Sequence, residues 1–414
     1  DVNKGKTQAT IGDGATVNAV NTGANAAQDI LVRAVDVTNI DSAAGGAAIG
    51  GQTAIGGAFT VAIVTNDVQA VALGNNVLNA ADDVTFDAQT HGDTFSLSIS
   101  VAGALATNSE SNSNDNSGGS TNFSGAGSGT GNTYTNSTVA EIRAGSSVDA
   151  GGDLTLTALD DTSITGDAGG ASLLLDLNNS NDTNIAVGAS VAVNLIDTVV
   201  RAKITDSTVD AGGDVTLSAT SEQTIDTLTL AGSFTVDTQS STAFGGAGSG
   251  SGNKVTATIE AAIDPSMITA GGDVSVTATD ASTITADAAS AALVVATGGG
   301  SGSMTTIAAG AAAATNDSAS TTRAAIEDTT LTAGGGVTLS AASTSSISAL
   351  TLGIAGALGV GGSGGTTTLA GAGSGSGNTV TNTVEAVVRN STVNAGGPMG
   401  LTATDDTTIS ATAG

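Results

Sequence analysis

Hydrophobic and polar residues alternate strictly along many stretches of the chain. In the segment Val-Thr-Leu-Ser-Ala-Thr at 215–220, apolar residues take every second position and hydroxyl residues lie between them. A period of two is the pattern of a half-buried β-strand, because successive side chains of a strand point to opposite faces. Leu, Glu, Lys and Arg at helical spacing are missing, so the pattern predicts an all-β chain.

A turn of small residues precedes each of these strands. The sequence Asp-Ala-Gly-Gly-Asp-Val-Thr-Leu-Ser-Ala-Thr at 210–220 recurs in variant form at 149–158, 269–279, 332–341 and 394–404, with a worn copy at 79–88. We interpret Gly-Gly as a corner whose backbone conformation disfavours residues with side chains. An Asp at the following strand start commonly bonds nearby backbone N–H groups. The predicted turn residues are Gly151, Gly152, Asp153, Gly212, Gly213, Gly271, Gly272, Asp273, Gly334, Gly335, Gly396 and Gly397.

Asparagine marks the same repeat. The intervals between successive marker residues are 66, 62, 59, 63 and 62 residues. We expect these side chains at coil corners, where their amides would bond backbone groups that the turn leaves unpaired. The marker residues are Asn66, Asn132, Asn194, Asn253, Asn316 and Asn378.

The repeat predicts a parallel β-helix, or β-solenoid, in which stacked coils bury a narrow core. A unit of about 60 residues is expected to hold three coils of about 20 residues, or two of about 30, and about 20 coils would make a rod of order 100 Å. The expected units are 66–131, 132–193, 194–252, 253–315 and 316–377, followed by a partial unit at 378–414 with an open end. Residues 1–65 are less regular and are expected to form atypical coils or a cap.

The genetic period is expected to be doubled, to about 120 residues. The string Gly-Ala-Gly-Ser-Gly-x-Gly precedes only every second marker Asn, at 125–131, 246–252 and 371–377. Strands of Gly alternating with Ala or Ser let another backbone come close. Two interpretations remain open: these strands narrow the cross-section of the solenoid, or they form a lateral packing face for a second chain.

Composition and charge narrow the classes of partner. The 414 residues include 59 Gly, no Cys and 2% aromatic residues, and the net charge is −29. Such an acidic chain is a poor ligand for nucleic acid or anionic membranes, and no stretch is apolar enough to span a bilayer. Neither an initiator Met nor a signal peptide opens the sequence, so we expect a mature product or an excised fragment.

Catalysis has few candidate groups. His91 is the only His, and we expect it in an exposed turn. A polysaccharide-degrading β-helix would need clustered carboxylates and aromatic sugar platforms, whereas this chain has one Tyr and no Trp. We therefore expect no enzyme, no catalytic residue and no organic cofactor.

Calcium is the alternative ligand, because carboxylate-rich turns supply hard oxygen donors. The calcium candidates are Asp206, Asp210, Asp214, Asp280, Asp405 and Asp406. The glycine-aspartate nonapeptide of calcium-binding β-rolls is missing, so a purely structural turn remains the competing interpretation.

Scarce basic residues recur on the strand before the Gly-Gly turn, at Arg143, Lys203, Arg323 and Arg389. Stacked coils would align them against acidic neighbours, as a charge-balancing ladder or as a stripe for an anionic ligand. Two polar stretches, 108–120 and 178–184, are expected to be loops, and insertions of this kind often lie on the binding face of a solenoid.

The repeat motif reads Ser-Thr-Val-x-Ala-Gly-Gly-Asp-Val-Thr-Leu-Thr-Ala-Thr and is best matched at Ser207–Thr220 and Ser391–Thr404. It resembles the repeats of giant bacterial surface proteins. The nearest types are filamentous-haemagglutinin-type and leukotoxin-like filamentous adhesins. The resemblance covers residues 66–414 and implies a right-handed parallel β-helix, exported and displayed as an adhesin stalk or filament. Self-association end to end is the expected partnership, and a host or matrix glycan or protein is a further candidate partner.

Overall fold

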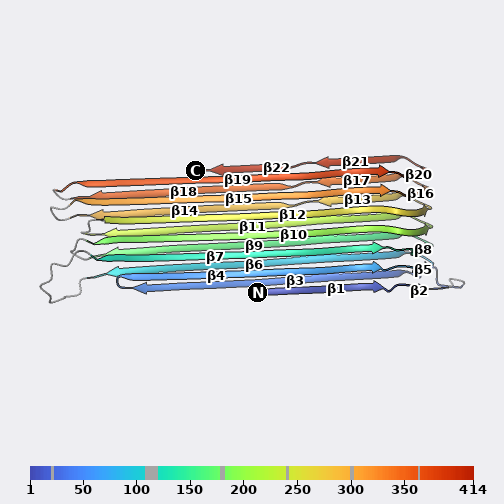
Figure 1. Cartoon of the computed structure of the whole chain (residues 1–414), viewed down its shortest axis with the longest axis horizontal. Coiled ribbons are helices and arrows are strands. Elements are labelled where there is room, and N and C mark those ends of the chain that lie inside the picture. Colours follow the sequence, from blue (N-terminus) through green and yellow to red (C-terminus); the bar gives the residue numbers. More distant parts are fainter. Residues whose placement is uncertain (20–22, 108–119, 178–181, 239–241, 299–302, 362–363) are drawn as a thin grey trace.

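The computed structural model shows two long parallel β-sheets stacked face to face (Figure 1). It describes residues 1–19, 23–107, 120–177, 182–238, 242–298, 303–361 and 364–414. Sheet A contains the long strands β1 (Val2–Ile11), β4 (Thr53–Ala72), β7 (Thr121–Ile142), β10 (Thr183–Ala211), β12 (Thr242–Ala270), β15 (Met304–Glu327) and β19 (Thr366–Arg389). Its short strands are β2 (Thr16–Val17), β5 (Val77–Ala80), β8 (Ser147–Ala150), β16 (Thr330–Ala333) and β20 (Thr392–Ala395).

Sheet B faces sheet A and is stacked in the same order. Its strands are β3 (Ile30–Gly50), β6 (Val84–Ala106), β9 (Leu154–Asp176), β11 (Val215–Asp237), β13 (Val274–Asp280), β14 (Thr283–Thr297), β17 (Val337–Ser343), β18 (Ser346–Val360), β21 (Met399–Asp405) and β22 (Thr408–Ala413). The chain runs along sheet A, turns at Ala-Gly-Gly, returns along sheet B and then enters the next strand of sheet A. All-β composition and the parallel solenoid are therefore confirmed.

Each repeat unit is one coil, so the prediction of three coils per unit is wrong. Asn194 pairs directly with Asn253, its counterpart 59 residues later, with no strand between them. The prediction failed because a unit of about 60 residues was taken to be too long for one coil. The unit fits into one coil because its strands are as long as the 29 residues of β10.

The molecule is consequently a flat blade rather than a long rod. In the described residues, seven coils are stacked from β1 and β3 to β19 and β22, and the less regular segment 1–65 supplies the first coil and, from Thr53 onward, the start of the second. At about 4.8 Å per coil the stack is roughly 30 Å tall, whereas a strand of 23 residues such as β11 spans about 75 Å. Figure 1 shows the strands running along the longest axis of the molecule.

The coil has a wide half and a narrow half. The wide half, for example Val200–Ala211 facing Val215–Ala219, encloses the main core of Val, Leu, Ile and Ala next to the Gly-Gly turns. In β11 the inward Val215, Leu217 and Ile225 are fully buried. Because every second residue is apolar, each coil adds one layer to this core.

In the narrow half, for example Thr183–Val193 facing Leu228–Asp237, the two backbones are in near contact. A Cβ added at Gly188 would lie within 3.0 Å of the carbonyl oxygen of Gly232, and one at Gly353 equally close to that of Gly373. In the Gly-rich strand β12, Ala247, Ser249 and Ser251 point inward while the glycines between them face out. Gly alternating with Ala or Ser thus narrows the cross-section, which confirms that interpretation.

Candidate functional site

The Gly-Gly turns form a column in which each coil rests on the backbone of the previous one. A Cβ at Gly212 would fall within 3.0 Å of the Gly151 carbonyl oxygen, and Gly271, Gly334 and Gly396 repeat the arrangement. None of these glycines has a positive φ. The predicted turns are present, but Gly is required there for lack of space and not for an unusual backbone conformation.

The Asp residues after Gly-Gly form a second column, in which each carboxylate accepts a hydrogen bond from the next coil. Asp153 Oδ1 accepts from Asp214 N at 2.8 Å, and Asp214 Oδ1 accepts from Asp273 N at 2.7 Å. Asp273 Oδ1 accepts from Gly336 N at 2.7 Å. The sequence predicted such backbone bonds, and the structure shows that they join neighbouring coils.

The Asp column ends at Gly336, which bonds Asp273 of the previous coil. Gly336 supplies no carboxylate to the next coil, and the residue in the following coil is Pro398, which has no N–H group. The loss of the acceptor in one coil and of the donor in the next leaves no unpaired group between them.

The six calcium candidates are not brought together. Asp206, Asp210 and Asp214 are exposed at different points around the turn, and Asp214 bonds the next coil. Asp280 is fully buried between the sheets and accepts a hydrogen bond from Ser282 Oγ at 2.6 Å. Asp405 and Asp406 lie on the exposed last coil, where Thr407 Oγ1 donates to Asp405 at 2.6 Å.

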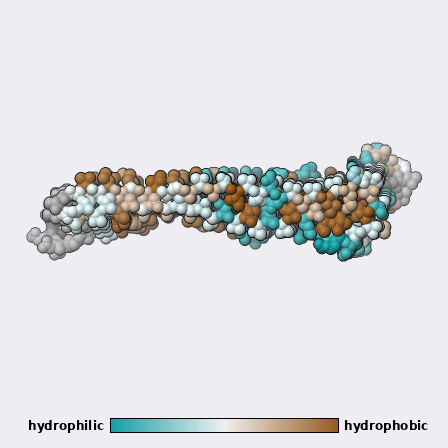
Figure 2. Space-filling model, turned by 90° about the horizontal axis from the view of Figure 1, so that it is seen from above, coloured by the Kyte–Doolittle hydropathy of each residue, from teal (hydrophilic) through white to brown (hydrophobic). Residues whose placement is uncertain are grey.

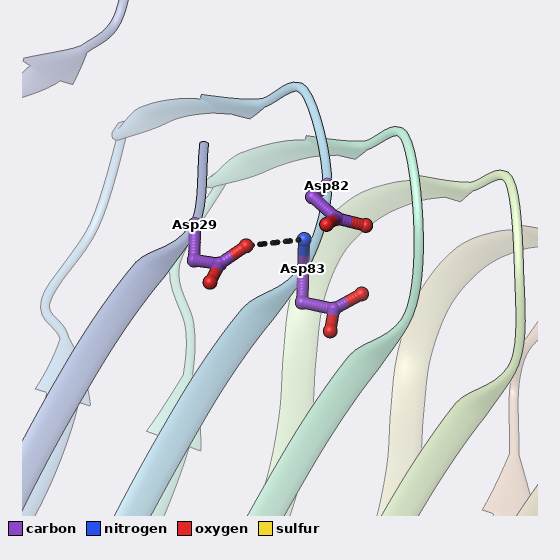
Figure 3. A group of neighbouring side chains, drawn as sticks. All are labelled: Asp29, Asp82 and Asp83. Carbon is purple, nitrogen blue, oxygen red and sulfur yellow. Dashed lines mark hydrogen bonds between the residues drawn. The ribbon is translucent and has the colours of Figure 1, made fainter. Parts of the chain in front are cut away.

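Another acidic cluster, Asp29, Asp82 and Asp83, does converge (Figure 3). Carboxylate oxygens of the three lie within 4.8 Å of one another where the first two coils enter sheet B, and Asp83 N donates to Asp29 Oδ1 at 3.3 Å. Partial burial, together with the charges of Asp83, Asp29 and Asp153, raises the pKa of Asp82. These oxygens could hold a divalent cation.

Sequence reasoning missed this cluster because Asp29 lies outside any copy of the repeat. The worn copy at 79–88 did carry a signal, since Ala81-Asp82-Asp83 replaces the usual Gly-Gly-Asp. A Cβ at Gly152 in the next coil would fall within 3.0 Å of both Asp82 and Asp83 carboxylate oxygens, so the glycine there makes room for the cluster.

The repeated asparagines lie in the middle of sheet A with their amides between the sheets, so the expected corner position is wrong. Each donates to the next: Asn132 to Asn194 at 2.7 Å, Asn194 to Asn253 at 2.9 Å, Asn253 to Asn316 at 2.9 Å and Asn316 to Asn378 at 2.8 Å. Asn66 is not part of this ladder, because it pairs in register with Asn136. The amides satisfy one another rather than a turn.

A third inward column alternates Asp with Ser. In register along sheet B lie Asp160, Ser221, Asp280, Ser343 and Asp405. Burial raises the pKa of Asp160, and hydrogen bonds from Thr162, Thr198 and Asn136 oppose that shift. A Ser between successive carboxylates keeps them two coils apart, about 10 Å, which limits their repulsion.

The basic residues form the expected ladder on the outer face of sheet A. Arg201, Glu260, Arg323 and Glu385 are in register and alternate in sign. Arg323 contacts Glu260 at 3.2 Å, Glu385 at 3.1 Å and Glu327 at 2.6 Å. Burial acts to lower the pKa of Arg323, but these glutamates outweigh it and raise the pKa.

The other three predicted ladder residues also have acidic partners. Arg389 pairs with Glu327 at 2.9 Å, Lys203 with Glu260 at 3.6 Å, and Arg143 with Glu141 at 3.1 Å. Each of these cations therefore faces a carboxylate of its own or a neighbouring coil. The ladder and the Asp/Ser column both have a period of two coils, as the doubled repeat of about 120 residues predicts.

His91 lies on strand β6, so the prediction that it lies in a turn is wrong. Its side chain faces outward, with Nδ1 3.8 Å from Asp161 Oδ2. Most of the two polar stretches, residues 108–119 and 178–181, lies outside the described residues.

Across the described ranges, the chain contains no helix long and apolar enough to cross a membrane.

Comparison with known proteins yields no relatives: no family model, no curated protein and no solved structure matches this chain.

Proposed function

We propose that this chain is a structural, non-enzymatic β-solenoid that forms a stalk or filament on the surface of a bacterium, serving adhesion or the extracellular matrix. One observation carries the proposal: polar columns run from coil to coil, and each member is bonded by its own counterpart in the next coil. The Asn ladder and the Asp column both do this. Such columns repeat the same bond at every added coil, as expected of a stack that can be extended and not of a protein built around one local binding site.

The mechanism is mechanical. Backbone hydrogen bonds of both sheets run along the stack, so a pull along that axis loads many parallel bonds at each coil boundary. Inside, the Asn ladder fixes which residue of one coil lies over which residue of the next, because a slipped register would leave buried amides unpaired. The net charge of −29 keeps such a surface hydrated and disfavours aggregation.

The proposed partner is another coil of the same kind, in a longer polypeptide or a second copy. In the last described coil the strand edges of β21 and β22 face outward, and Leu401 and Ile409 are 46% and 48% exposed. Their counterparts one coil earlier, Leu339 and Ile347, are 0% and 1% exposed. A further coil would bury these side chains and pair the edge.

Electron microscopy at rising protein concentration tests this proposal. Fibres of constant width with strands perpendicular to the fibre axis, giving a fibre-diffraction repeat of about 4.8 Å along it, are expected. Isolated blades at every concentration would contradict end-to-end association and leave a stalk segment within one chain. Adding calcium or a chelator shows whether a cation at Asp29, Asp82 and Asp83 affects assembly.

The surface location has its own test. Protease added to intact cells that express the chain should remove it from outside, while a cytoplasmic marker stays intact. Protection of the chain until the cells are lysed would contradict the proposed location.

A further inference from the structure

The outer face of sheet B in the narrow half carries a continuous apolar patch. We define it as Ile99, Val101, Leu173, Leu230, Phe234, Leu293, Leu352 and Ile354, from strands β6, β9, β11, β14 and β18. Their exposed fractions run from 38% at Phe234 to 52% at Ile354. Figure 2, which looks along the stack, shows hydrophobic side chains along a long edge of the left half, and both hydrophobic and hydrophilic ones in the right half.

Charged side chains stop at the border of the patch. Outward positions in register with Ile99 to Leu105 on the four following strands are Gly, Ala, Leu, Ile, Phe or Val throughout. Asp167 and Asp287 lie one outward position away and mark the boundary. An apolar area of this extent is unusual in a chain with a net charge of −29 and marks an interaction surface.

The patch has a ridge beside a groove. Leu173, Phe234 and Leu293 are in register on three successive strands and form the ridge. Ala171, Gly232 and Ala291, one outward position away, form the floor of a groove of about 570 Å³. Val101 and Ile354, in register with that floor, close its two ends.

We propose that this patch binds a second copy of the chain, ridge into groove. A two-fold axis parallel to the stack, placed between ridge and groove, puts the Phe234 ridge of each copy over the Gly232 floor of the other. Ridge and groove are two residues apart, about 7 Å, and both copies have the same coil spacing of about 4.8 Å, so contacts match along the whole patch. A partner without this spacing would match at one coil only.

The size of the patch fits a dimer. Five strands and about eight residues of each cover roughly 600 Å² of sheet, before the relief of the side chains is added. Both copies together bury at least about 1,200 Å², which reaches the lower range of specific interfaces. The contact is isologous and closes at two copies, unlike the open-ended stacking of coils, so it is independent of the proposed filament.

Sedimentation equilibrium of the whole chain tests the proposal. At concentrations below those at which fibres form, the mass should rise with concentration from 39.0 kDa to twice that value and stop there. Leu230→Lys with Phe234→Lys should weaken the dimer at least about a hundredfold, because two central apolar contacts would then bury charges. The matched control, Thr216→Lys with Ser218→Lys, changes outward residues of the same strand in the wide half and should leave the dimer intact.

A second variant tests whether the interface depends on the shape of the groove or only on its apolar character. Gly232→Leu fills the groove, and no atom lies within 4 Å of the Cβ it adds, so the fold should survive. It should block the ridge and favour the monomer. Tighter association of this variant, a wild-type chain that stays at 39.0 kDa, or binding of the patch to neutral phosphatidylcholine vesicles in place of a second copy would each overturn the proposal.

Discussion

At the scale of single residues, glycine has two distinct uses in this chain. Gly212 lies against the backbone of the previous coil, where an added Cβ would collide with the Gly151 carbonyl oxygen. Gly248 lies on the outer face of sheet A with no atom within 4 Å of that position. Sequence alone does not distinguish them, because both occur in runs of small residues.

We expect Gly212→Ala to destabilise the chain by about 2 kcal/mol, because a rigid carbonyl must move to admit the methyl group. Gly248→Ala should be neutral within about 0.5 kcal/mol. Urea unfolding of both variants at one protein concentration measures the difference. Equal midpoints for the two variants would mean that the turn column relaxes freely.

Asp160 gives the chain a pH dependence of a recognisable sign. Its pKa is raised by burial, so the folded state holds the proton more tightly than the unfolded chain. The resulting stabilisation is fully present below the ordinary Asp pKa of about 3.9 and is lost as the pH rises through the raised value.

Asp160→Asn should therefore remove a fall in stability that the wild type shows as the pH rises from about 4 through the raised pKa of Asp160. Asp210→Asn, on an exposed position of strand β10, should retain the wild-type profile. Unfolding midpoints measured across this range decide the matter. A wild-type profile in the Asp160 variant would show that this carboxyl does not titrate in that interval.

At the scale of elements, neighbouring strands are matched by charge across sheet A. Arg323 forms ion pairs with three glutamates, Glu260, Glu327 and Glu385, and its side chain is only 20% exposed. Partly buried networks of this kind contribute more than an isolated surface pair. Lys254, by contrast, lies 3.8 Å from Asp317 with its side chain 52% exposed.

Arg323→Met should cost about 1–2 kcal/mol, since it leaves three carboxylates without their shared cation. Lys254→Met should cost less than about 0.5 kcal/mol. The difference should shrink as salt screens the remaining carboxylates. Denaturant midpoints at low and high salt test this. A loss of stability in Arg323→Met that does not change with the salt concentration would point to lost packing instead.

The strands and their turns were predictable, whereas the size of the coil was not. Alternation in segments such as 215–220 fixes which face is buried, and Ala-Gly-Gly marks one end of the coil. Asn194 and Asp280 misled the prediction, because polar side chains usually mark turns and are rarely buried without partners. Here each has a partner in the neighbouring coil, about 60 residues away, a relation that no local pattern contains.

The same long-range pairing left the acidic cluster of Asp29, Asp82 and Asp83 unpredicted. Asp29 and Asp82 come together only because their coils are neighbours in sheet B. The charge ladder was predictable, since Arg323 and Arg389 recur at the same place in the repeat. Its acidic members Glu260 and Glu327 were missed, because their register depends on coil size.

At the scale of the whole molecule, the period of two coils has an energetic reason that deletions can expose. Removing residues 194–252 takes out one coil and with it Ser221, which brings Asp160 next to Asp280 at about 5 Å between the sheets. Two buried carboxylates at that distance cannot both be charged. Removing 194–315 takes out two coils and places Asp160 beside Ser343, which restores the alternation.

The larger deletion should therefore unfold at a higher urea concentration than the smaller one, although it loses more core. The smaller deletion should gain stability on acidification, because a shared proton relieves the pair, and Asp280→Asn within it should remove that gain. If stability simply followed the number of coils, as nearest-neighbour stacking of identical units requires, the smaller deletion would be the more stable at neutral pH. That ranking would contradict the two-coil unit and leave the coil itself as the unit that can be repeated.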